Sequence, residues 1–486
     1  MCFSTTSSSP HHRQLEYPTY NASAREPIIN LRHKNVVQSP IYILPPEILS
    51  LIFQFTCLPL DFSRRYPLGQ EKPDKRLQFI LGAVSAIWRE ITLSTPQLWT
   101  FVDLNVRTTT LECTLEILYT YFKRSGNLLM AIGLNFFPDP EGKHVFPTFP
   151  QHSQRIHQLH INNLPSNWTN ILASSFENLR HLTAFDPFHD LLLDVPCSHL
   201  TLMHTTRPVV VHCATVTTLC LIRMHEDFCL KLLRECVNLI EFSCTNPQDS
   251  PTAAAEQISP LPKDPFELPH LKSFEWPVWN LSEFDRAMLQ HIRMPALHTL
   301  YWVEEDIQAL EASDPRITFY DHLPSKTLAN LYLVSESSDV GVSSVFSDFI
   351  CRVPSVSYLH ATDHGGRVLN CLFERLTIIE ELHERPIALP NLETISIYDS
   401  GPKPFRTVDF AGLIQMCKSS LCKRSFPVKR LSLLEIAIEP KREVAWPFRL
   451  RFEFLELVAK GLDVKITNTG VPVDWLPQVT SHIESS

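Results

Sequence analysis

The feature that most constrains how this chain can fold is a short apolar pattern that recurs from residue 156 to residue 433. In each instance an apolar residue is followed by two others, then by a second apolar residue and often by a third two places later. Such a unit supplies one short strand whose apolar face it cannot bury alone, so neighbouring units must stack to form a core. The pattern therefore predicts a curved solenoid of parallel strands. Its instances are Ile156-Leu159-Ile161, Leu179-Leu182, Leu200-Met203, Val216-Leu219-Leu221, Leu239-Phe242, Leu271-Phe274-Trp276, Leu297-Leu300-Trp302, Leu328-Leu331-Leu333, Val356-Leu359, Leu392-Ile395-Ile397 and Val428-Leu431-Leu433.

The spacing of these units is irregular. Ten intervals cover 272 residues, with a mean near 27 and individual gaps from 16 to 36. Proline often precedes the pattern, as at Pro269, Pro295, Pro354 and Pro390, which suits a residue that cannot donate into a central ladder. Each strand is therefore expected to begin just after its proline. A less regular α/β domain with a parallel sheet is the alternative for this part of the chain.

The last apolar segment predicts a helix followed by a strand, which together cap the open end of the stack. The helix is expected over residues 448–462 and the strand over residues 464–466. Helical spacing is carried by Leu450, Phe454, Leu455 and Val458.

The N-terminal region changes character at Ile41. Residues 1–40 are rich in Ser, His and Pro without apolar periodicity, so we expect a disordered tail. Pro45 and Pro46 then suit the first turn of a helix, where their missing N–H groups cost no hydrogen bond. The apolar residues of this helix form a stripe that must be covered, and they are Ile48, Leu49, Ile52 and Phe53.

Two further short helices are expected before residue 104. Thr95 and Pro96 mark the start of the second of them, with Leu98 and Trp99 as its apolar anchors. Three short helices in about 60 residues bury too little surface to be securely stable alone, so this region should pack on a partner or on the rest of the chain. The helix that precedes Thr95 has its apolar residues at helical spacing, and they are Leu77, Ile80, Leu81, Val84 and Trp88.

Four linked pieces occur in one order between residues 43 and 104: Leu44-Pro45-Pro46-Glu47-Ile48-Leu49, Ile52-Phe53, Val84-Ser85-Ala86-Ile87-Trp88-Arg89 and Leu93-Ser94-Thr95-Pro96-Gln97-Leu98-Trp99. Together they resemble the F-box motif in the variant common in fungal proteins. In that family the first helix and its flanks dock on a Skp-type adaptor, which joins the F-box protein to a cullin scaffold. The resemblance implies that Trp88 and Trp99 hold the helices together, and that the adaptor is bound by Leu44, Pro45, Ile48, Leu49, Ile52 and Phe53.

One stretch departs from the F-box pattern. The segment from Leu58 to Arg76 is longer than the usual connection between the first two helices, so it is either a harmless loop or a feature that alters docking. Taken without the resemblance, the whole region reads as a small helical cap on the repeat domain.

The repeated pattern is similar to that of leucine-rich repeats, which many F-box proteins carry. The expected fold class is therefore α/β, with a small N-terminal three-helix F-box-like unit followed by an irregular leucine-rich-repeat solenoid with a parallel sheet. The expected domains are a disordered tail over 1–40, an F-box-like domain over 41–104, a connecting segment over 105–150 and a leucine-rich-repeat-like domain with a C-terminal cap over 151–486.

Composition argues against several kinds of partner. The formal net charge of the 486 residues is -9, and no long basic run is present, so nucleic acid is not an expected ligand. No apolar run approaches the roughly 18 to 20 residues of a membrane span, and the first residues do not have the form of a secretory signal. We therefore expect no membrane partner and a cytoplasmic or nuclear location.

The 13 cysteines are scattered singly, which predicts free thiols rather than a disulfide framework. The densest group has spacings of 7, 9, 7 and 8 residues, without the close pairs that bind zinc. No nucleophile elbow, phosphate-binding loop or H-E-x-x-H motif is present. We therefore expect no catalytic residue, no metal site, no cofactor and no enzyme activity. The group consists of Cys213, Cys220, Cys229, Cys236 and Cys244, with His212 and His225 nearby.

Strand alternation separates two kinds of aromatic residue. It places Trp276 and Trp302 with the inward leucines, and Tyr301 and Tyr332 on the opposite, concave face. Exposed tyrosine and arginine are frequent interface anchors. The candidate target-binding residues are therefore Glu275, Tyr301, Tyr332 and Arg430. An error of one residue in strand register would turn all four toward the core.

These features together indicate a substrate-receptor subunit of a Skp-cullin-F-box ubiquitin ligase. It would bind a Skp-type adaptor through the F-box and a target protein through the repeats, while ubiquitin chemistry occurs on other subunits. The alternative is a non-ligase repeat scaffold for protein–protein interaction. A third hypothesis is an enzyme whose cysteine or histidine site is assembled from distant parts of the chain.

Overall fold

The computed structural model divides the chain into two compact units. Unit 1 comprises residues 1–58 and 76–99, and unit 2 comprises residues 59–75 and 100–486. The expected tail up to residue 39 and the long connection from 58 to 76 lie outside the described residues. The structure describes residues 40–57, 77–107, 109, 111–137, 150–163, 176–185, 191–193, 197–203, 209–248, 264–278, 282–304, 314–335, 349–363, 367–377, 379–380, 385–386, 388–399, 410–421, 431–438, 448–468 and 471–472.

Unit 1 is helical throughout its described part. Helix α2 begins at Pro46, as predicted, because a proline costs no hydrogen bond in the first turn. The single helix expected over residues 77–88 is instead two helices. Ser85 is extended and its Oγ accepts a hydrogen bond from the Trp88 amide, which caps the start of the second one. The elements are η1 (Pro40–Ile43), α2 (Pro46–Thr56), α3 (Leu77–Val84), α4 (Ala86–Ser94) and η2 (Pro96–Trp99).

The helices of unit 1 enclose a small core of their own. Phe53 of α2 packs on Trp88 of α4, with ring centroids 4.8 Å apart. Trp99 is buried, and its Nε1 donates to the Thr92 carbonyl oxygen over 2.8 Å. Both tryptophans therefore hold the helices together, as expected.

Three polar side chains connect the helices of this core. Thr95 Oγ1 lies 3.0 Å from Ser50 Oγ on α2 and donates to the Ile91 carbonyl oxygen on α4. The Thr95 hydroxyl thus links α2 to α4, whereas the sequence suggested that it caps the next helix. Buried Gln78 of α3 donates through Nε2 to the Leu98 carbonyl oxygen over 3.0 Å, which ties α3 to η2.

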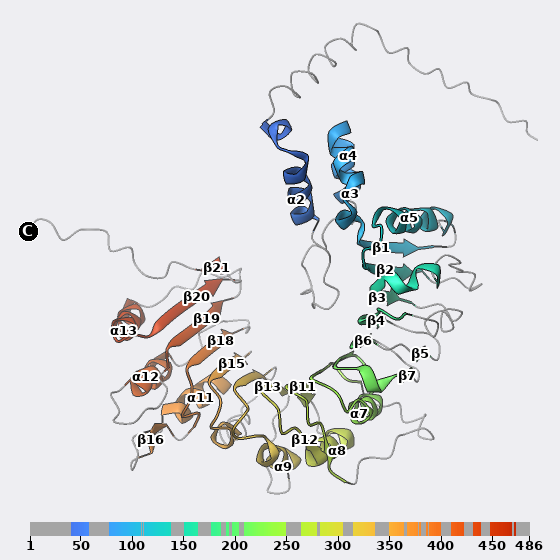
Figure 1. Ribbon diagram of the computed structural model, residues 1–486. Helices are drawn as coiled ribbons and strands as arrows, with labels where there is room; N and C mark the ends of the chain where they lie inside the picture. Colours follow the sequence, from blue (N-terminus) through green and yellow to red (C-terminus); the bar gives the residue numbers. More distant parts are fainter. Residues whose placement is uncertain are drawn as a thin grey trace, which may run out of the picture. The chain divides into compact units, whose positions relative to one another are not determined.

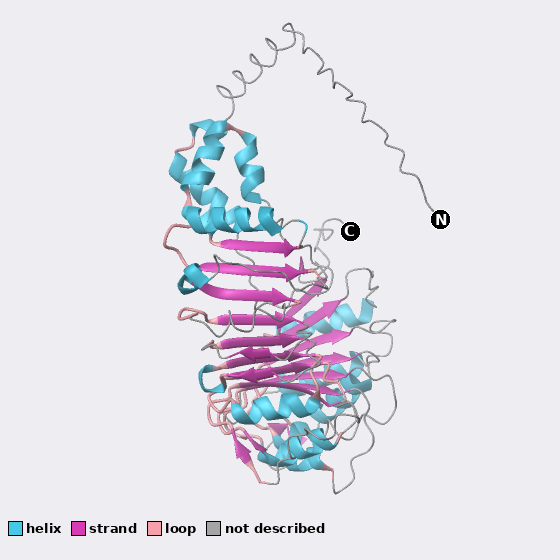
Figure 2. Cartoon of the chain, turned by 90° about the vertical axis from the view of Figure 1, so that its right-hand side faces the viewer, coloured by secondary structure: helices cyan, strands magenta, loops and turns pink. Residues whose placement is uncertain are grey.

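Unit 2 is built around one long sheet whose strands lie side by side in chain order (Figures 1 and 2). Every neighbouring pair is parallel except the last, β20 and β21, which is antiparallel. The predicted α/β class with a parallel sheet is confirmed. The strands are β1 (Phe101–Val106), β2 (Met130–Phe136), β3 (Ile156–Asn162), β4 (His181–Phe185), β6 (His199–Met203), β8 (Thr218–Ile222), β9 (Glu241–Thr245), β11 (Ser273–Val278), β13 (Thr299–Glu304), β14 (Asn330–Ser335), β15 (Tyr358–Asp363), β18 (Thr394–Asp399), β19 (Leu433–Ile438), β20 (Asp463–Asn468) and β21 (Val471–Pro472).

The connections between these strands carry the helices. Within unit 2, helices α7 to α13 follow the outer side of the curved sheet and the strands line its inner side (Figure 1). We call the inner side the open face. The helices are α5 (Leu111–Arg124), η4 (Pro150–Arg155), η6 (Cys213–Thr215), α7 (Glu226–Glu235), α8 (Glu283–His291), α9 (Pro315–His322), α11 (Arg367–Thr377), α12 (Phe410–Leu421) and α13 (Phe448–Ala459). Small two-stranded sheets pair β5 (Leu191–Leu193) with β7 (Val209–Val211), β10 (Phe266–Glu267) with β12 (Ile292–Arg293) and β16 (Ile379–Glu380) with β17 (Arg385–Pro386).

The core of unit 2 lies between the sheet and its helices. Leu300 pairs in register with Leu331, and Trp276 with Trp302, and all four side chains are fully buried. Trp302 also packs on Phe319 of α9, with ring centroids 5.1 Å apart. Each repeat therefore buries its apolar residues against those of its neighbours, as stacked repeats require.

Each of the four prolines named in the sequence analysis lies within a tight turn that comes before the strand, and not directly at the start of the strand. Each proline stands second in a four-residue turn closed by a backbone hydrogen bond, as between the Leu271 amide and the Leu268 carbonyl oxygen. Proline suits that position because its fixed φ matches the turn. The strands begin four residues after the proline, so Pro269 precedes β11 at Ser273. The other three turns are closed between Leu297 and Met294, Val356 and Val353, and Leu392 and Leu389.

The sheet begins earlier in the chain than predicted. Strand β1 runs from residue 101 to residue 106 and pairs with β2, which pairs with β3. The expected connecting segment over 105–150 therefore supplies part of the sheet, and the expected boundary at 104 falls inside β1. These two strands were missed because they alternate apolar and other residues with a period of two, as in Val102, Leu104 and Val106, without the longer repeat pattern.

Two predicted repeats are out of register by three residues. In Leu200-Met203, Leu200 was expected at the first position, but it pairs with Leu182 and Leu219, which hold the second position of their units. The other displaced unit is Val428-Leu431-Leu433, because Ile395 of β18 pairs with Leu434 and Ile397 pairs with Ile436. Apolar residues at 428, 431 and 434 fit two frames equally well, and only the pairing of β19 with β18 selects between them. The C-terminal helix and strand are present as α13 and β20.

Candidate functional site

Helix α2 of unit 1 carries apolar residues on two different sides. Leu49 and Phe53 are 1% exposed and belong to the core of the unit. Ile48 is 43% exposed, Ile52 40% and Phe55 72%. A helix that is apolar on both sides is normally buried on both sides, so the second side is a candidate docking surface. We call it the α2 stripe, and it consists of Leu44, Ile48, Leu51, Ile52 and Phe55.

The α2 stripe differs from the adaptor-binding set inferred from the F-box resemblance. Leu44, Pro45, Ile48 and Ile52 are exposed, as that role requires. Leu49 and Phe53 lie instead in the core of unit 1, and we therefore remove them from the docking set. Adjacent residues of a helix point about 100° apart, so the four apolar residues that looked like one stripe belong to two sides.

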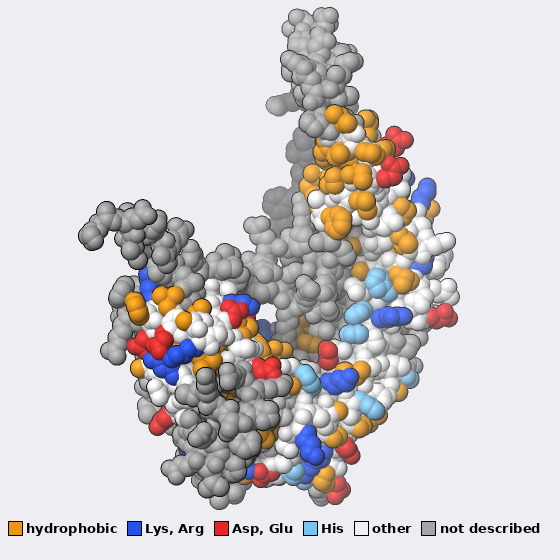
Figure 3. Space-filling model, turned by 60° about the vertical axis from the view of Figure 1, so that its left-hand side comes forward, with side chains coloured by type: hydrophobic (Ala, Val, Ile, Leu, Met, Phe, Trp, Pro, Cys, Tyr) orange, Lys and Arg blue, Asp and Glu red, His pale blue; other side chains and the backbone are white. Residues whose placement is uncertain are grey.

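Further apolar side chains on unit 1 are exposed beyond α2. Phe79, Ile80 and Val84 of α3 are each about half exposed, as is Ile87 of α4. Figure 3 shows hydrophobic side chains gathered over the helices of this unit. Ile80 and Val84 were expected on the apolar side of one helix that continues to Trp88, but that segment forms two helices, and both side chains are exposed.

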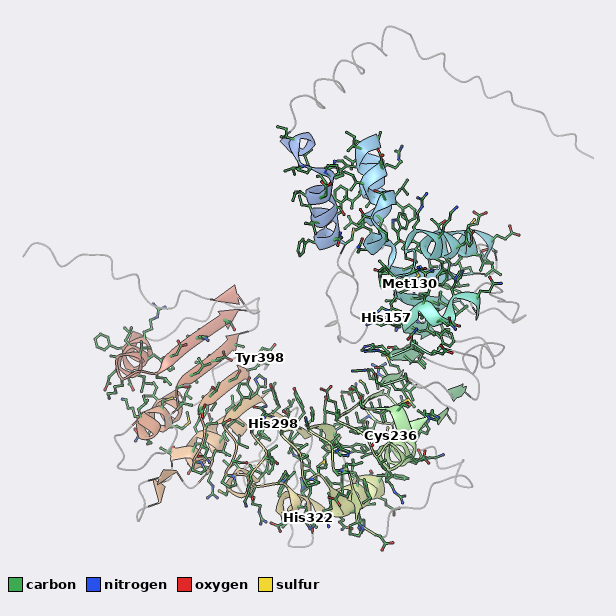
Figure 4. All side chains as sticks on the ribbon, in the orientation of Figure 1. Met130, His157, Cys236, His298, His322 and Tyr398 are labelled. Carbon is green, nitrogen blue, oxygen red and sulfur yellow. The ribbon has the colours of Figure 1, made fainter. Side chains whose placement is uncertain are left out.

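The open face of unit 2 carries the aromatic residues that strand alternation assigned to it. Trp276 and Trp302 are fully buried on the helical side, whereas Tyr301 and Tyr332 are half-buried on the open face, paired directly across β13 and β14. The register prediction was correct for these strands. Figure 4 shows the labelled Tyr398 and His298 along the inner side of the curve, and the labelled Cys236 and His322 beside the helices.

Four neighbouring side chains form an aromatic cluster there, which we call the tyrosine strip: Tyr301, Tyr332, Tyr358 and His360. The rings of Tyr301 and Tyr332 are stacked, with centroids 4.1 Å apart. The Tyr332 ring lies 5.5 Å from the rings of both Tyr358 and His360. Spacings of this kind are favourable for aromatic pairs. The strip therefore holds its rings in place across three strands, β13, β14 and β15.

Burial keeps two side chains of the tyrosine strip, Tyr301 and His360, uncharged near pH 7. Burial, together with Tyr332 and Glu275, raises the pKa of Tyr301 to about 12. Burial lowers the pKa of His360, whose Nδ1 lies 3.0 Å from Ser396 Oγ and whose Nε2 lies 3.1 Å from Thr362 Oγ1. Tyr301 and His360 therefore add no charge to this aromatic surface.

Carboxylates stand on both sides of the tyrosine strip. Glu275 is on β11, in register with Tyr301, and its Oε2 accepts a hydrogen bond from Ser243 Oγ over 2.6 Å. Arg430, the fourth predicted target-binding residue, lies outside the described residues. The corrected register of β19 places Glu435 in the row of the tyrosine strip, because Ser396 pairs with Glu435. The expected frame, displaced by three residues, left Glu435 out of this row.

The cysteine cluster does not converge on one point. Cys229 and Cys244 lie together in the core with sulfurs 3.8 Å apart, and burial raises the pKa of Cys244. A hydrogen bond with Cys236 lowers the pKa of half-buried Cys213. Cys220 faces the other way, beside Ser243 in the open-face row. No group of three or more His, Cys, Asp or Glu residues in the described part of the chain is arranged to hold a metal ion.

The described helices are all too short or too polar to cross a membrane. Neither the protein-family models nor the curated proteins compared with this chain include a match.

Proposed function

We propose that unit 1 is an F-box-like docking module and that the chain is a substrate-receptor subunit of a Skp-cullin-F-box ubiquitin ligase. The observation that carries the proposal is the α2 stripe, which is apolar and lies outside the core of its own unit. Leaving apolar surface in water costs roughly 25 cal/mol per Å², so a partner that covers the stripe gains that free energy. The F-box resemblance names a Skp-type adaptor as the partner for this helix.

Unit 2 supplies the second half of the proposed role. Its long parallel sheet is compatible with the resemblance to leucine-rich repeats, and its open face offers a broad sheet surface for a target protein. A receptor of this kind does no covalent chemistry, and it raises the local concentration of the target near the ligase. The cysteines of the described part are free thiols, which agrees with work in the reducing cytoplasm or nucleus.

The test is direct binding of the purified full chain to a purified Skp-type adaptor, measured by calorimetry. The test variant is Leu44→Ala/Ile48→Ala/Ile52→Ala, which truncates the α2 stripe and leaves buried Leu49 and Phe53 intact. The matched control is Ile117→Ala/Val237→Ala/Phe452→Ala, because these three apolar residues are also exposed but lie in unit 2. Circular dichroism and thermal unfolding verify that all three proteins are folded.

Binding by the wild type and the control, with loss of binding in the α2 variant, is the expected result. A folded wild type that does not bind the adaptor overturns the proposal and leaves a helical cap on a repeat protein. A second experiment mixes the purified chain, the purified adaptor and a purified cullin. If the chain binds the adaptor but the cullin does not join the complex, the non-ligase scaffold is favoured instead.

A further inference from the structure

The open face of unit 2 has an uneven distribution of charge. From β8 to β19, the described open-face side chains that carry a charge at neutral pH are all acidic: Glu241, Glu275 and Glu435. Arg223 and Lys272 lie in the connections next to β8 and β11. At the β19 end, Lys465 of β20 pairs in register with Glu435, and its Nζ lies 3.8 Å from Asp463 Oδ2. A partner segment laid across β8 to β18 therefore meets the carboxylates of Glu241 and Glu275 and no opposing lysine or arginine from those strands, whereas beside Glu435 it also meets Lys465.

The aromatic rings of the tyrosine strip also favour a positively charged partner. The stacked Tyr301 and Tyr332, together with Tyr358, give electron-rich surface between the two flanking carboxylates. Lysine and arginine side chains are attracted to the faces and edges of such rings, and arginine stacks on them especially well. His360 adds no positive charge that would oppose this attraction, because burial keeps its ring neutral.

We propose that the tyrosine strip, flanked by Glu275 and Glu435, binds an extended basic segment of a partner protein. One lysine or arginine lies over the tyrosine rings, and others pair with the two carboxylates. The proposal rests on the proposed role of the open face as a target-binding surface and names the chemistry of that target.

The arrangement also sets the length of the segment. Glu275 on β11 and Glu435 on β19 are separated by five strand-to-strand steps through β13, β14, β15 and β18. Neighbouring strands lie about 4.8 Å apart, so the two carboxylates are on the order of 24 Å apart along the sheet. An extended chain advances about 3.3 Å per residue. A segment of about seven residues that crosses the strands therefore reaches both carboxylates.

The experiment is selection from a random heptapeptide phage library on the immobilised full chain, followed by affinity measurement on the enriched peptides. The test variants are Glu275→Gln/Glu435→Gln and Tyr301→Leu/Tyr332→Leu. The matched control is Glu283→Gln/Glu374→Gln, which removes the same two negative charges from exposed positions on α8 and α11. The control separates a local site from general attraction to an acidic protein.

The expected result is enrichment of lysine- and arginine-containing peptides that bind the wild type and the control equally. They should bind each test variant at least about tenfold more weakly, with affinity that falls as salt is added. Enrichment without basic residues, no enrichment at all, or equal binding to Glu275→Gln/Glu435→Gln overturns the inference. None of these results bears on adaptor binding through α2, so failure here and failure of the docking proposal are distinguishable.

Discussion

Trp276 and Asp285 are joined by a buried hydrogen bond in which the indole Nε1 donates to Oδ1 over 2.7 Å. The second oxygen of the same carboxylate accepts from the Ser282 amide, and Ser282 Oγ accepts from the Asp285 amide. This reciprocal pair is a capping box at the start of α8. One carboxylate therefore fixes strand β11 to the helix that follows it.

Substitution at either end of this hydrogen bond should destabilise unit 2. Trp276→Phe leaves a buried carboxylate oxygen without its indole partner, at a cost of roughly 1–3 kcal/mol. Asp285→Ala removes both the acceptor of the Trp276 indole N–H and the capping box of α8. It should therefore cost about 1 kcal/mol more than Trp276→Phe. Urea unfolding measures both. Glu283→Ala is the control, because Glu283 is an exposed acid in the same helical turn. If Glu283→Ala destabilises as much as Asp285→Ala, the capping role is wrong.

The two sides of α2 should respond differently to truncation. Leu49→Ala empties part of the core of unit 1 and should lower its stability by roughly 2–5 kcal/mol. Ile48→Ala removes a neighbouring exposed side chain of the same size and should change stability by less than about 0.5 kcal/mol. Hydrogen exchange of the α2 amides distinguishes them. Equal loss of protection in both variants would mean that the helix is not two-sided.

A buried ion pair in α9 should matter more than an exposed pair of the same length. Arg316 Nη2 lies 2.6 Å from Asp314 Oδ2, and both side chains are almost fully buried. Lys460 Nζ lies the same 2.6 Å from Glu456 Oε1, with both side chains about half exposed. Asp314→Ala removes the buried carboxylate from this ion pair, together with the N-cap hydrogen bond that Asp314 Oδ1 accepts from the Arg316 amide, and should cost roughly 3–5 kcal/mol. Glu456→Ala should leave the urea midpoint unchanged, and a comparable shift in both would contradict the burial argument.

The tyrosine strip should make stability depend on pH. Burial lowers the pKa of His360 below its usual value of 6.5. As pH falls below about 6.5 the unfolded chain gains a proton that the folded chain does not, so stability is present above that pH and decreases below it. His360→Gln removes the imidazole that takes up this proton in the unfolded chain and keeps a polar side chain next to Ser396. The fall in urea midpoint between about pH 7.5 and pH 5.5 should be smaller in the variant than in the wild type. An identical fall would exclude His360 as its source.

Cysteine labelling tests the burial of the thiols. Cys113 and Cys351 are exposed, whereas burial raises the pKa of Cys197 and of Cys417 to about 12. The thiolate is the reactive form, so maleimide near neutral pH should label the first two residues quickly and the other two only after denaturation. Peptide mapping by mass spectrometry follows each site. Rapid labelling of Cys417 in the native protein would contradict its placement in the core.

The sequence by itself determined the local features of this fold. The alternation of Leu300, Tyr301 and Trp302 predicted which side chain is buried and which lies on the open face, because a strand has a period of two whatever its neighbours are. The apolar repeat likewise predicted a parallel sheet, since a short strand with one apolar face is stable only in a stack. Pro45 and Pro46 marked the start of α2, because proline is compatible with the first turn of a helix and not with its interior.

Only the tertiary structure decided the register of β19 and the division of α2 into a buried and an exposed side, because the local sequence pattern fits both alternatives in each case. Pairing with β18 selected Leu434 over Leu431 as the partner of Ile395 and brought Glu435 into the row of the tyrosine strip. Packing of Phe53 on Trp88 divided the apolar residues of α2 between a core and an exposed stripe. Both outcomes depend on contacts between residues far apart in the chain. The local pattern has the same period in either case, and the free energy that separates the alternatives arises only when the distant partner is in place.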